Sequence, residues 1–236
     1  MFFECPTRPL SMVALYVAAA RLSGPSDWRR VWGDRLQARR TDRAPGAARR
    51  LAQNGRGRPL SPARQDPTVN IAPARAGDAD ALLALRNHYI AHSIATFDEA
   101  PLAPAAVRDW MAGFADGGPH RLLVARDGDR LMGWCSSQPY RAHPAFARTI
   151  ETSVYVAPDA ARSGVGSALY TRLFDDLGGL GLHRAVVGIA LPNDASVRLH
   201  ARFGFRPVGV FDEYAHKNGR AISSQWMQRA MDAGAP

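Results

Sequence analysis

The chain contains few cysteines and no long apolar run. Only Cys5 and Cys135 occur among its 236 residues. The sequence therefore predicts neither a disulfide framework nor a Cys-based zinc site, and it favours a reducing compartment. The longest apolar run, 12–20, is too short to cross a bilayer, and Arg8 before it gives only a faint signal-peptide pattern. We therefore expect a cytoplasmic protein that uses no metal and contacts no membrane.

The positive charge is concentrated in the first part of the chain. Residues 1–68 carry 13 Arg and no Lys against 5 Asp or Glu, a net charge of +8, whereas 69–236 carry 17 basic and 16 acidic residues. Between 21 and 67 there is no sustained helical or alternating period, and Trp28 and Trp32 are the only large aromatic residues. Such a segment buries too little apolar surface to offset its ordering entropy. We predict a disordered basic extension over 1–68 and a globular domain over 69–236.

From Val69 onwards, strand patterns alternate with helix patterns. The segment 69–74 predicts a first strand, Gly77 and Asp78 open a helix, and a second helix begins around Ala105. A β-hairpin follows, with its turn at the Asp127–Gly128 pair. Further strands are predicted at 183–191, around Val208 and at 222–227. This order predicts a mixed α/β layer.

The segment 151–174 carries the strongest chemical signal. β-Branched and aromatic residues at 153–156 predict a strand that Pro158 ends, and Gly164 and Gly166 then lead into an amphipathic helix. The first N–H groups of a helix lack intrahelical partners and attract phosphate, and glycine allows a pyrophosphate to approach closely. The third glycine of a dinucleotide fingerprint and the lysine of a P-loop are both lacking, so an ordinary strand-to-helix turn stays open.

This order of acid, apolar strand, Pro-bearing turn, GxG and helix resembles the acyl-CoA-binding core of the GNAT N-acetyltransferase family. The stretch LPNDASVRLHARFGF at 191–205 resembles that family's second cofactor motif, in which Asn193 starts a helix. With NHYI at 87–90 and ETSVYV at 151–156, the chain resembles the phosphinothricin and methionine-sulfone acetyltransferase branch. The resemblance covers 69–236. It implies the GNAT α/β fold, a mixed, mostly antiparallel sheet flanked by helices, with acetyl-CoA as cosubstrate and a homodimer.

The resemblance also implies how acetyl-CoA is held. Backbone amides of the Gly loop would bind the pyrophosphate, and main-chain groups of the strand would pair with the pantetheine arm and polarise the thioester carbonyl. Ala161 stands where the family usually has Gln or Arg, and Arg162 could supply the missing charge. The implied cofactor-binding residues are Val154, Tyr155, Val156, Arg162, Ser163, Gly164, Val165, Gly166, Ser167 and Asn193.

Glu151 and His200 are the candidate catalytic residues. An ammonium substrate must lose a proton near neutral pH, and the carboxylate of Glu151, at the start of the central strand, is a plausible acceptor. The matching Glu is the proposed general base in the resembling branch. The alternative is an acid that only binds the ammonium or pairs with an Arg. His200 stands where much of the wider family has a Tyr that protonates the departing thiolate and where the resembling branch carries His. An imidazole can donate that proton near pH 7, and the alternative is a satisfied core histidine.

Three residues are candidates for binding the acceptor. Phe97, with Ser93 and Thr96 beside it, lies where the branch has its acceptor pocket, although Phe97 also fits a plain core position. Arg141 stands ten residues before Glu151, where related enzymes carry a cation for an amino-acid carboxylate. Arg148 is a second candidate for that cation, and either arginine could instead be a solvated surface residue.

The sequence thus predicts an N-acetyltransferase that transfers acetyl from acetyl-CoA directly to the α-amine of a small amino acid or analogue. An alternative acceptor is a protein N-terminus or another amine. A hypothesis of a different class is a nucleic-acid-binding protein that uses the arginine pairs of 1–68. We favour a solvated tail or a start codon placed too early, because the family resemblance begins only at Val69.

Overall fold

A computed structural model describes residues 69–231, so the predicted disordered extension over 1–68 lies outside the described residues. The helices and strands of the described part are β1 Asn70–Pro73, α1 Ala79–His92, α2 Pro104–Met111, β2 Arg121–Asp127, β3 Arg130–Pro139, β4 Thr149–Val156, α3 Val165–Leu177, β5 Arg184–Ala190, α4 Asp194–Arg202, β6 Arg206–Lys217 and β7 Arg220–Ala230. Short 3-10 turns precede α1, β4 and α3.

The strands form one seven-stranded sheet in the order β1-β2-β3-β4-β5-β7-β6. All neighbours are antiparallel except β4 and β5, which are parallel. This confirms the predicted mixed, mostly antiparallel sheet flanked by helices. The β4 strand is the fourth of seven, as expected for the segment that carries Glu151.

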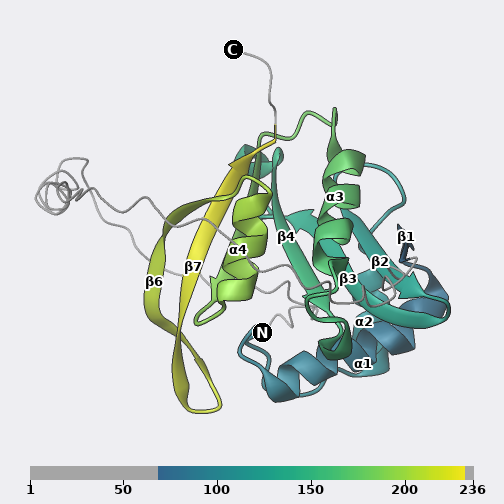
Figure 1. Ribbon diagram of the computed structural model, residues 1–236. Helices are drawn as coiled ribbons and strands as arrows, with labels where there is room; N and C mark the ends of the chain where they lie inside the picture. Colours follow the sequence, from purple (N-terminus) through teal and green to yellow (C-terminus); the bar gives the residue numbers. More distant parts are fainter. Residues whose placement is uncertain (1–68, 232–236) are drawn as a thin grey trace, which may run out of the picture. The chain divides into compact units, whose positions relative to one another are not determined.

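The helices cover both faces of the sheet. Adjacent residues of a strand point to opposite faces, and the neighbours Trp134 and Cys135 of β3 meet different helices. The Trp134 ring lies 5.2 Å from the Trp110 ring of α2, whereas the Cys135 Sγ lies 3.5 Å from the Leu169 carbonyl of α3. Figure 1 shows α3 and α4 in front of the sheet, with α1 and α2 together at its lower end.

The α3 helix supplies a large part of the core. Its apolar side chains at spacings of three and four residues are buried, as the amphipathic pattern predicted, and they are Val165, Leu169, Tyr170, Leu173 and Leu177. Fully burying a side chain of leucine size is worth about 1.5–3 kcal/mol relative to exposure. This packing fixes the N-terminus of α3 against the sheet, which matters for the site described below.

One sequence prediction shifts slightly in the structure. The hairpin turn is formed by Gly128, with φ of 58°, and Asp129, one residue later than the predicted Asp-Gly pair. The α2 helix ends at Met111, so Phe114 lies beyond it and packs against the Trp110 ring from the following loop. No helix within residues 69–231 is long and apolar enough to span a membrane.

Candidate active site

The first part of the site is the N-terminus of α3. Gly164 caps the helix with φ of 88°, a left-handed conformation that side chains with a Cβ adopt at a cost. The Ala168 N–H donates to the Gly164 carbonyl at 3.0 Å, which makes it the first helical bond. The N–H groups of residues 165–167 precede that bond and have no intrahelical acceptor. They form a small cluster of donors at the positive end of the helix dipole.

Gly166 lets three elements approach one another next to these donors. A Cβ at position 166 would lie 3.2 Å from Leu199 Cδ2 of α4 and 3.5 Å from Val156 Cγ2 of β4. A Cβ placed at Gly164, in contrast, would meet nothing within 4 Å. Gly166 therefore allows α3 to pack closely against α4 and β4, whereas Gly164 allows the left-handed backbone conformation of an open loop.

The second part of the site is the edge of β4 that faces β5. The two strands pair only from Thr149 to Glu151, and no pairing continues beyond them. On the other side the Ala157 N–H donates to the Met132 carbonyl at 2.8 Å. Residues bonded to an antiparallel neighbour alternate with residues whose N–H and C=O point away from it. Val154 and Val156 therefore direct their main-chain groups away from β3, where β5 no longer pairs.

These features fit the acetyl-CoA site that the sequence predicts. The donors at 165–167 would hold the pyrophosphate, and the main-chain groups of Val154 and Val156 would hold the pantetheine arm. One carbonyl of this edge is already engaged, because the Tyr89 hydroxyl donates to the Val156 oxygen at 2.7 Å. Asn193 is the N-cap of α4, as predicted, and its Oδ1 accepts from the Ser196 N–H at 3.1 Å.

Three of the implied cofactor residues, Tyr155, Arg162 and Ser163, do not belong to the donor cluster at 165–167 or to the β4 edge that faces β5. The main chain of Tyr155 pairs with β3, and its ring is stacked on Trp134 at 4.7 Å, on the face away from α3. The Tyr155 ring therefore lies on the face of the sheet opposite α3, and its main chain does not point toward β5. Arg162 and Ser163 are exposed in the loop, and the Ser163 hydroxyl donates to the Ala160 carbonyl at 2.6 Å.

The third part of the site is a pocket on the face of the sheet opposite α3. Strand alternation places Glu151 on the same face as Tyr155. The residues around this pocket come from the loop after α1 and from β4, β5, β6 and β7, and they are Ala95, Phe97, Glu151, Gly188, Ala190, Tyr214, Ser224 and Trp226. We call it the acceptor pocket. Phe97 and Glu151, two of the candidate site residues, both line it.

Glu151 is the acidic residue of the acceptor pocket. Burial raises the pKa of its carboxyl to about 7 because a buried carboxylate loses water that stabilises its charge. At neutral pH the group is therefore present both with and without its proton. That is the pKa suited to a general base working near pH 7.

Neither predicted arginine lines the acceptor pocket. Arg141 is exposed and lies over the Tyr140 ring at 5.0 Å, and that ring contacts the pocket residue Trp226 at 6.1 Å. Arg148 is directed toward the loop after α3, where its Nε donates to the Gly181 carbonyl. Arg141 therefore connects to the pocket through the rings of Tyr140 and Trp226.

The sequence model of the acetyltransferase (GNAT) family matches residues 82–205. This chain belongs to the GNAT acetyltransferase family. It is 46% identical to a phosphinothricin N-acetyltransferase of Streptomyces coelicolor over 165 residues, 69% of this chain and 96% of that protein. It is 31% identical to an L-methionine sulfoximine/L-methionine sulfone acetyltransferase of Pseudomonas aeruginosa over 166 residues, 70% of this chain and 96% of that protein.

A solved structure supports the same assignment. An acetyltransferase from Salmonella typhimurium, solved with its cofactor acetyl-CoA, superposes with a TM-score of 0.65 at 28% identity, over 71% of this chain and 96% of that chain. The family and the relatives make this GNAT protein an N-acetyltransferase.

The structure places His200 of this N-acetyltransferase in the core, on the α3 side of the sheet. The residue is 1% exposed. Its Nδ1 lies 2.8 Å from the Ser196 carbonyl, which can only accept, so Nδ1 carries the proton. Its Nε2 then accepts from the Tyr170 hydroxyl at 2.8 Å. Burial lowers the pKa of His200 to about 4, so the ring is neutral and both nitrogens are engaged. This geometry favours the core-histidine alternative over the predicted proton donor.

Replacing His200 with Phe tests this interpretation. The change removes the two bonds of the imidazole, to the Tyr170 hydroxyl and the Ser196 carbonyl, and leaves that hydroxyl only its longer bond to Thr152 Oγ1 at 3.3 Å. Each lost bond costs about 0.5–1.5 kcal/mol. We expect a lower melting temperature and a kcat reduced by less than about tenfold, measured well below the melting point. The matched variant Tyr170→Phe should lose similar stability. A hundredfold loss of kcat with an unchanged melting temperature would restore the proton-donor role.

Most residues of the acceptor pocket could not be recognised in the sequence. Ser224 and Trp226 are two residues apart on β7, and Gly188 and Ala190 are two apart on β5. The spacing of two indicates that the two residues of each strand share one face of the sheet. It does not indicate which strands lie side by side. Gly188 pairs with Trp226 across the strands, and a Cβ at Gly188 would lie 3.2 Å from the indole ring. The absence of a side chain at Gly188 therefore allows the indole to lie close against β5.

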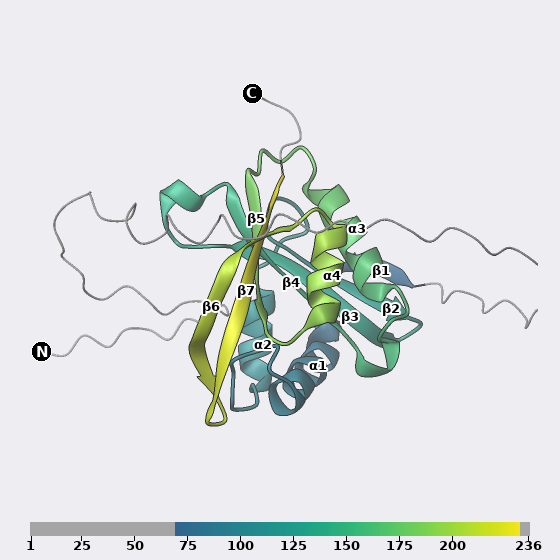
Figure 2. The same cartoon turned by 60° about the vertical axis from the view of Figure 1, so that its left-hand side comes forward.

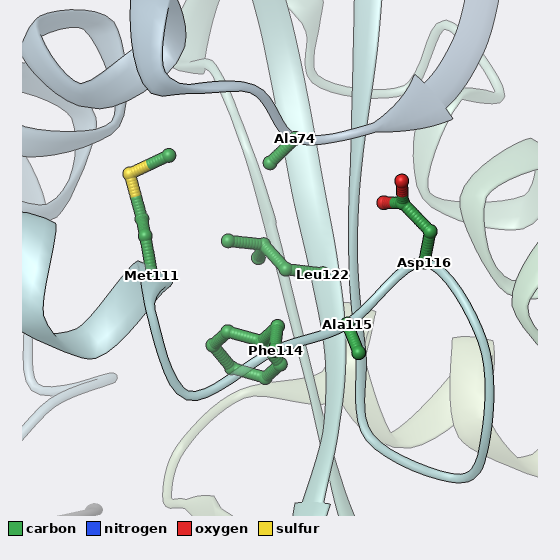
Figure 3. Close-up of a pocket in the computed structure, with 6 residues that line it drawn as sticks. All are labelled: Ala74, Met111, Phe114, Ala115, Asp116 and Leu122. Carbon is green, nitrogen blue, oxygen red and sulfur yellow. The ribbon is translucent and has the colours of Figure 1, made fainter.

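A second hollow lies at the opposite edge of the sheet (Figure 3), beside β1 and β2. Figure 3 shows the side chains of Met111, Phe114 and Leu122 pointing toward one another. The other lining residues are Ala74, Ala115 and Asp116. The only titratable group among the six is the exposed carboxylate of Asp116. This hollow does not include Glu151, and we assign it no part in acetyl transfer.

Proposed function

We propose that this chain is an acetyl-CoA-dependent N-acetyltransferase whose acceptor is the α-amine of a small amino acid or analogue, such as phosphinothricin or methionine sulfone. The observation that carries the proposal is the Glu151 carboxyl, with its pKa raised to about 7. It faces the acceptor pocket at the point where β4 and β5 stop pairing. The names of the relatives support the same class of acceptor.

The lining of the pocket supports a small acceptor. Phe97, Tyr214 and Trp226 contribute aromatic walls, and the Phe97 and Tyr214 rings meet edge to face at 6.0 Å. Polar groups are few and include the Ser224 hydroxyl. Within residues 69–231 the buried Trp226 Nε1 has no hydrogen-bond partner. Such a lining suits an amino acid with a short side chain that carries an acceptor oxygen.

Different groups of this chain carry out different steps of the proposed reaction. Bound acetyl-CoA supplies an acetyl group as a thioester. The Glu151 carboxylate would remove a proton from the acceptor ammonium, which frees the lone pair on nitrogen for attack on the thioester carbonyl. The C–N bond would form as the C–S bond breaks, and the second proton of the amine would pass to the departing thiolate to give the free thiol. The main-chain N–H groups of Val154 and Val156 are the donors available to polarise a carbonyl oxygen at the β4 edge.

Direct transfer is favoured by the state of Cys135. The thiol is fully buried on the α3 face, and burial raises the pKa of Cys135 above its usual range. A thiol that neither ionises nor meets substrate is a poor nucleophile. The proposed reaction therefore needs no covalent enzyme intermediate.

A protein N-terminus is the alternative acceptor. A solved structure named as a ribosomal-protein-alanine N-acetyltransferase from Brucella melitensis has 28% identity and a TM-score of 0.64, over 68% of this chain and 99% of that chain. The aromatic side chains around the acceptor pocket favour a single amino acid over an extended peptide, because a peptide needs a continuous open groove.

A thiol-release assay tests the proposal. The full chain is incubated with acetyl-CoA and with phosphinothricin, methionine sulfone, methionine sulfoximine or short peptides. We expect turnover with the amino-acid analogues and none with the peptides. Turnover of peptides alone would change the acceptor to a protein N-terminus, and the absence of turnover together with the absence of acetyl-CoA binding would overturn the proposal.

Two further expectations stay predictions. Exposed apolar side chains along the edge strand β6, at Val208, Val210 and Phe211, are compatible with the predicted homodimer. The cytoplasmic location rests on composition alone. The nucleic-acid hypothesis depends on 1–68 and so lies outside the described residues.

A further inference from the structure

The segment 93–99, which follows α1, forms one wall of the acceptor pocket. We call it the acceptor loop, and it presents Ala95 and Phe97 to the pocket. Hydroxyl groups shape it from within: the Ala95 N–H donates to Ser93 Oγ at 3.2 Å, and the Asp98 N–H donates to Thr96 Oγ1 at 3.3 Å. These turns leave the carbonyls of Ser93, Ala95 and Thr96 to find donors elsewhere.

Donors from distant strands bind these carbonyls. The Lys217 Nζ, at the end of β6, donates to the Ser93 oxygen at 2.8 Å and to the Thr96 oxygen at 2.9 Å. The Tyr155 hydroxyl, from β4, donates to the Ala95 oxygen at 2.8 Å. Ala95 and Phe97 thus lie beside the two points at which Lys217 holds the loop.

The hairpin that carries Lys217 contacts the loop at a second place. The Asn218 N–H donates to the Glu99 carboxylate. In both views the tip of the β6–β7 hairpin lies beside the segment that joins α1 to α2 (Figures 1 and 2). Residues more than 100 positions apart in the sequence therefore hold the pocket wall together.

Lys217 is unusual within its own sequence. It is the only lysine among the 30 Lys and Arg residues of the chain, and it is 3% exposed. An ammonium group is compact and directs three donors from a single atom, whereas a guanidinium is a planar fork. One ammonium can therefore bond two carbonyls that lie three residues apart on a tight loop. Burial lowers the pKa of Lys217, and the nearby carboxylates of Asp98 and Glu99 offset part of this effect by favouring the charged ammonium.

We propose that Lys217 is a positioning residue for the acceptor: its ammonium fastens the acceptor loop so that Phe97 and Ala95 form the pocket wall opposite Glu151. This role rests on the proposed function, because it concerns how the same pocket receives the amine substrate. Lys217 does not line the pocket, so it acts through the loop. Losing its two bonds should free the loop while the α3 N-terminus and the β4 edge stay in place.

The test compares Lys217→Met with Arg220→Met in the full chain. Both changes remove one positive charge from the same hairpin, but the Arg220 side chain is exposed and forms no hydrogen bond or ion pair with any of residues 69–231. For Lys217→Met we expect the KM of the amino-acid acceptor to rise about tenfold, since two hydrogen bonds from a charged donor are lost. The KM of acetyl-CoA should stay within about twofold. Arg220→Met should change neither constant.

Amide hydrogen exchange gives a readout independent of turnover. In Lys217→Met we expect faster deuterium uptake in 93–99 than in wild type, with 154–168 unchanged, and no such difference in Arg220→Met. An unchanged acceptor KM, or acceptor and acetyl-CoA KM values that rise together, would overturn the positioning role. If the wild-type protein shows no turnover, the proposed function fails, but the exchange experiment still tests Lys217. Unchanged exchange in 93–99 in Lys217→Met would overturn the proposal that Lys217 fastens the acceptor loop.

Discussion

Replacing Glu151 with Gln is expected to lower kcat/KM by about 10²–10⁴-fold, the usual contribution of a general base. Gln keeps the shape and the hydrogen-bonding oxygen of the side chain but cannot take up the proton of the acceptor ammonium. Binding of acetyl-CoA, measured by calorimetry, should be unchanged because the proposed cofactor site uses the α3 N-terminus and the main chain of Val154 and Val156, whereas the Glu151 side chain lies on the sheet face opposite α3. Steady-state kinetics of the two proteins check the prediction.

The pH dependence provides a second readout of the same residue. The base acts only when deprotonated, so with the pKa of Glu151 raised to about 7, kcat/KM should rise with pH below 7 and level off above it. An acid with its ordinary pKa near 4.3 would already be ionised across this range and would give a flat profile. In Glu151→Gln the break near pH 7 should disappear.

Glu213→Gln is the matched control, because it makes the same chemical change at an exposed carboxylate on β6. It should behave as wild type in both experiments. If Glu151→Gln kept wild-type kcat/KM with the break near pH 7 intact, Glu151 would be reduced to a binding or packing residue.

Replacing Gly164 with Val should raise the KM of acetyl-CoA by about 5–30-fold. A β-branched residue in the left-handed region costs about 1–2 kcal/mol, and the loop can relieve that strain only by turning its amides away from the direction that a pyrophosphate needs. A Cβ at this position meets no neighbour, so the effect comes from the backbone and not from a clash. Acceptor KM should change little.

Gly179→Val separates the local effect from general strain. Gly179 also has a positive φ, of 74°, it lies just beyond the C-terminal end of the same helix, and a Cβ there would also meet nothing within 4 Å. Both variants should lose similar thermal stability, while acetyl-CoA KM rises only in Gly164→Val. Equal effects of the two variants on acetyl-CoA KM would show that the Gly164 loop does not form the cofactor site.

Much of the cofactor side could be predicted because its signals are local. The strand 153–156, the turn at Pro158, the Gly164 cap and the buried face of α3 lie within about two dozen consecutive residues, and each follows from backbone preference and helical spacing. The Asn193 cap is equally local, since its oxygen bonds an N–H three residues on.

The acceptor side could not be predicted in the same way. Its pocket joins the loop after α1 to β4, β5, β6 and β7, and its lining became visible only once the sheet order was known. The surroundings of His200 could not be predicted for the same reason. Its position on α4 matched a catalytic motif, but Tyr170 of α3 and the Ser196 carbonyl engage both ring nitrogens in the core.

The sequence by itself determined the mixed α/β fold, the strand-loop-helix that presents free amides, and Glu151 as the acid beside it. Tertiary structure alone decided that Glu151 is desolvated, that Tyr155 faces the acceptor side, and that Lys217 reaches the acceptor loop from the far end of β6. The physical reason is how far apart in the sequence the interacting residues lie. Caps and helical faces depend on neighbours a few residues away, whereas desolvation and loop anchoring depend on which distant segments the folded sheet brings into contact.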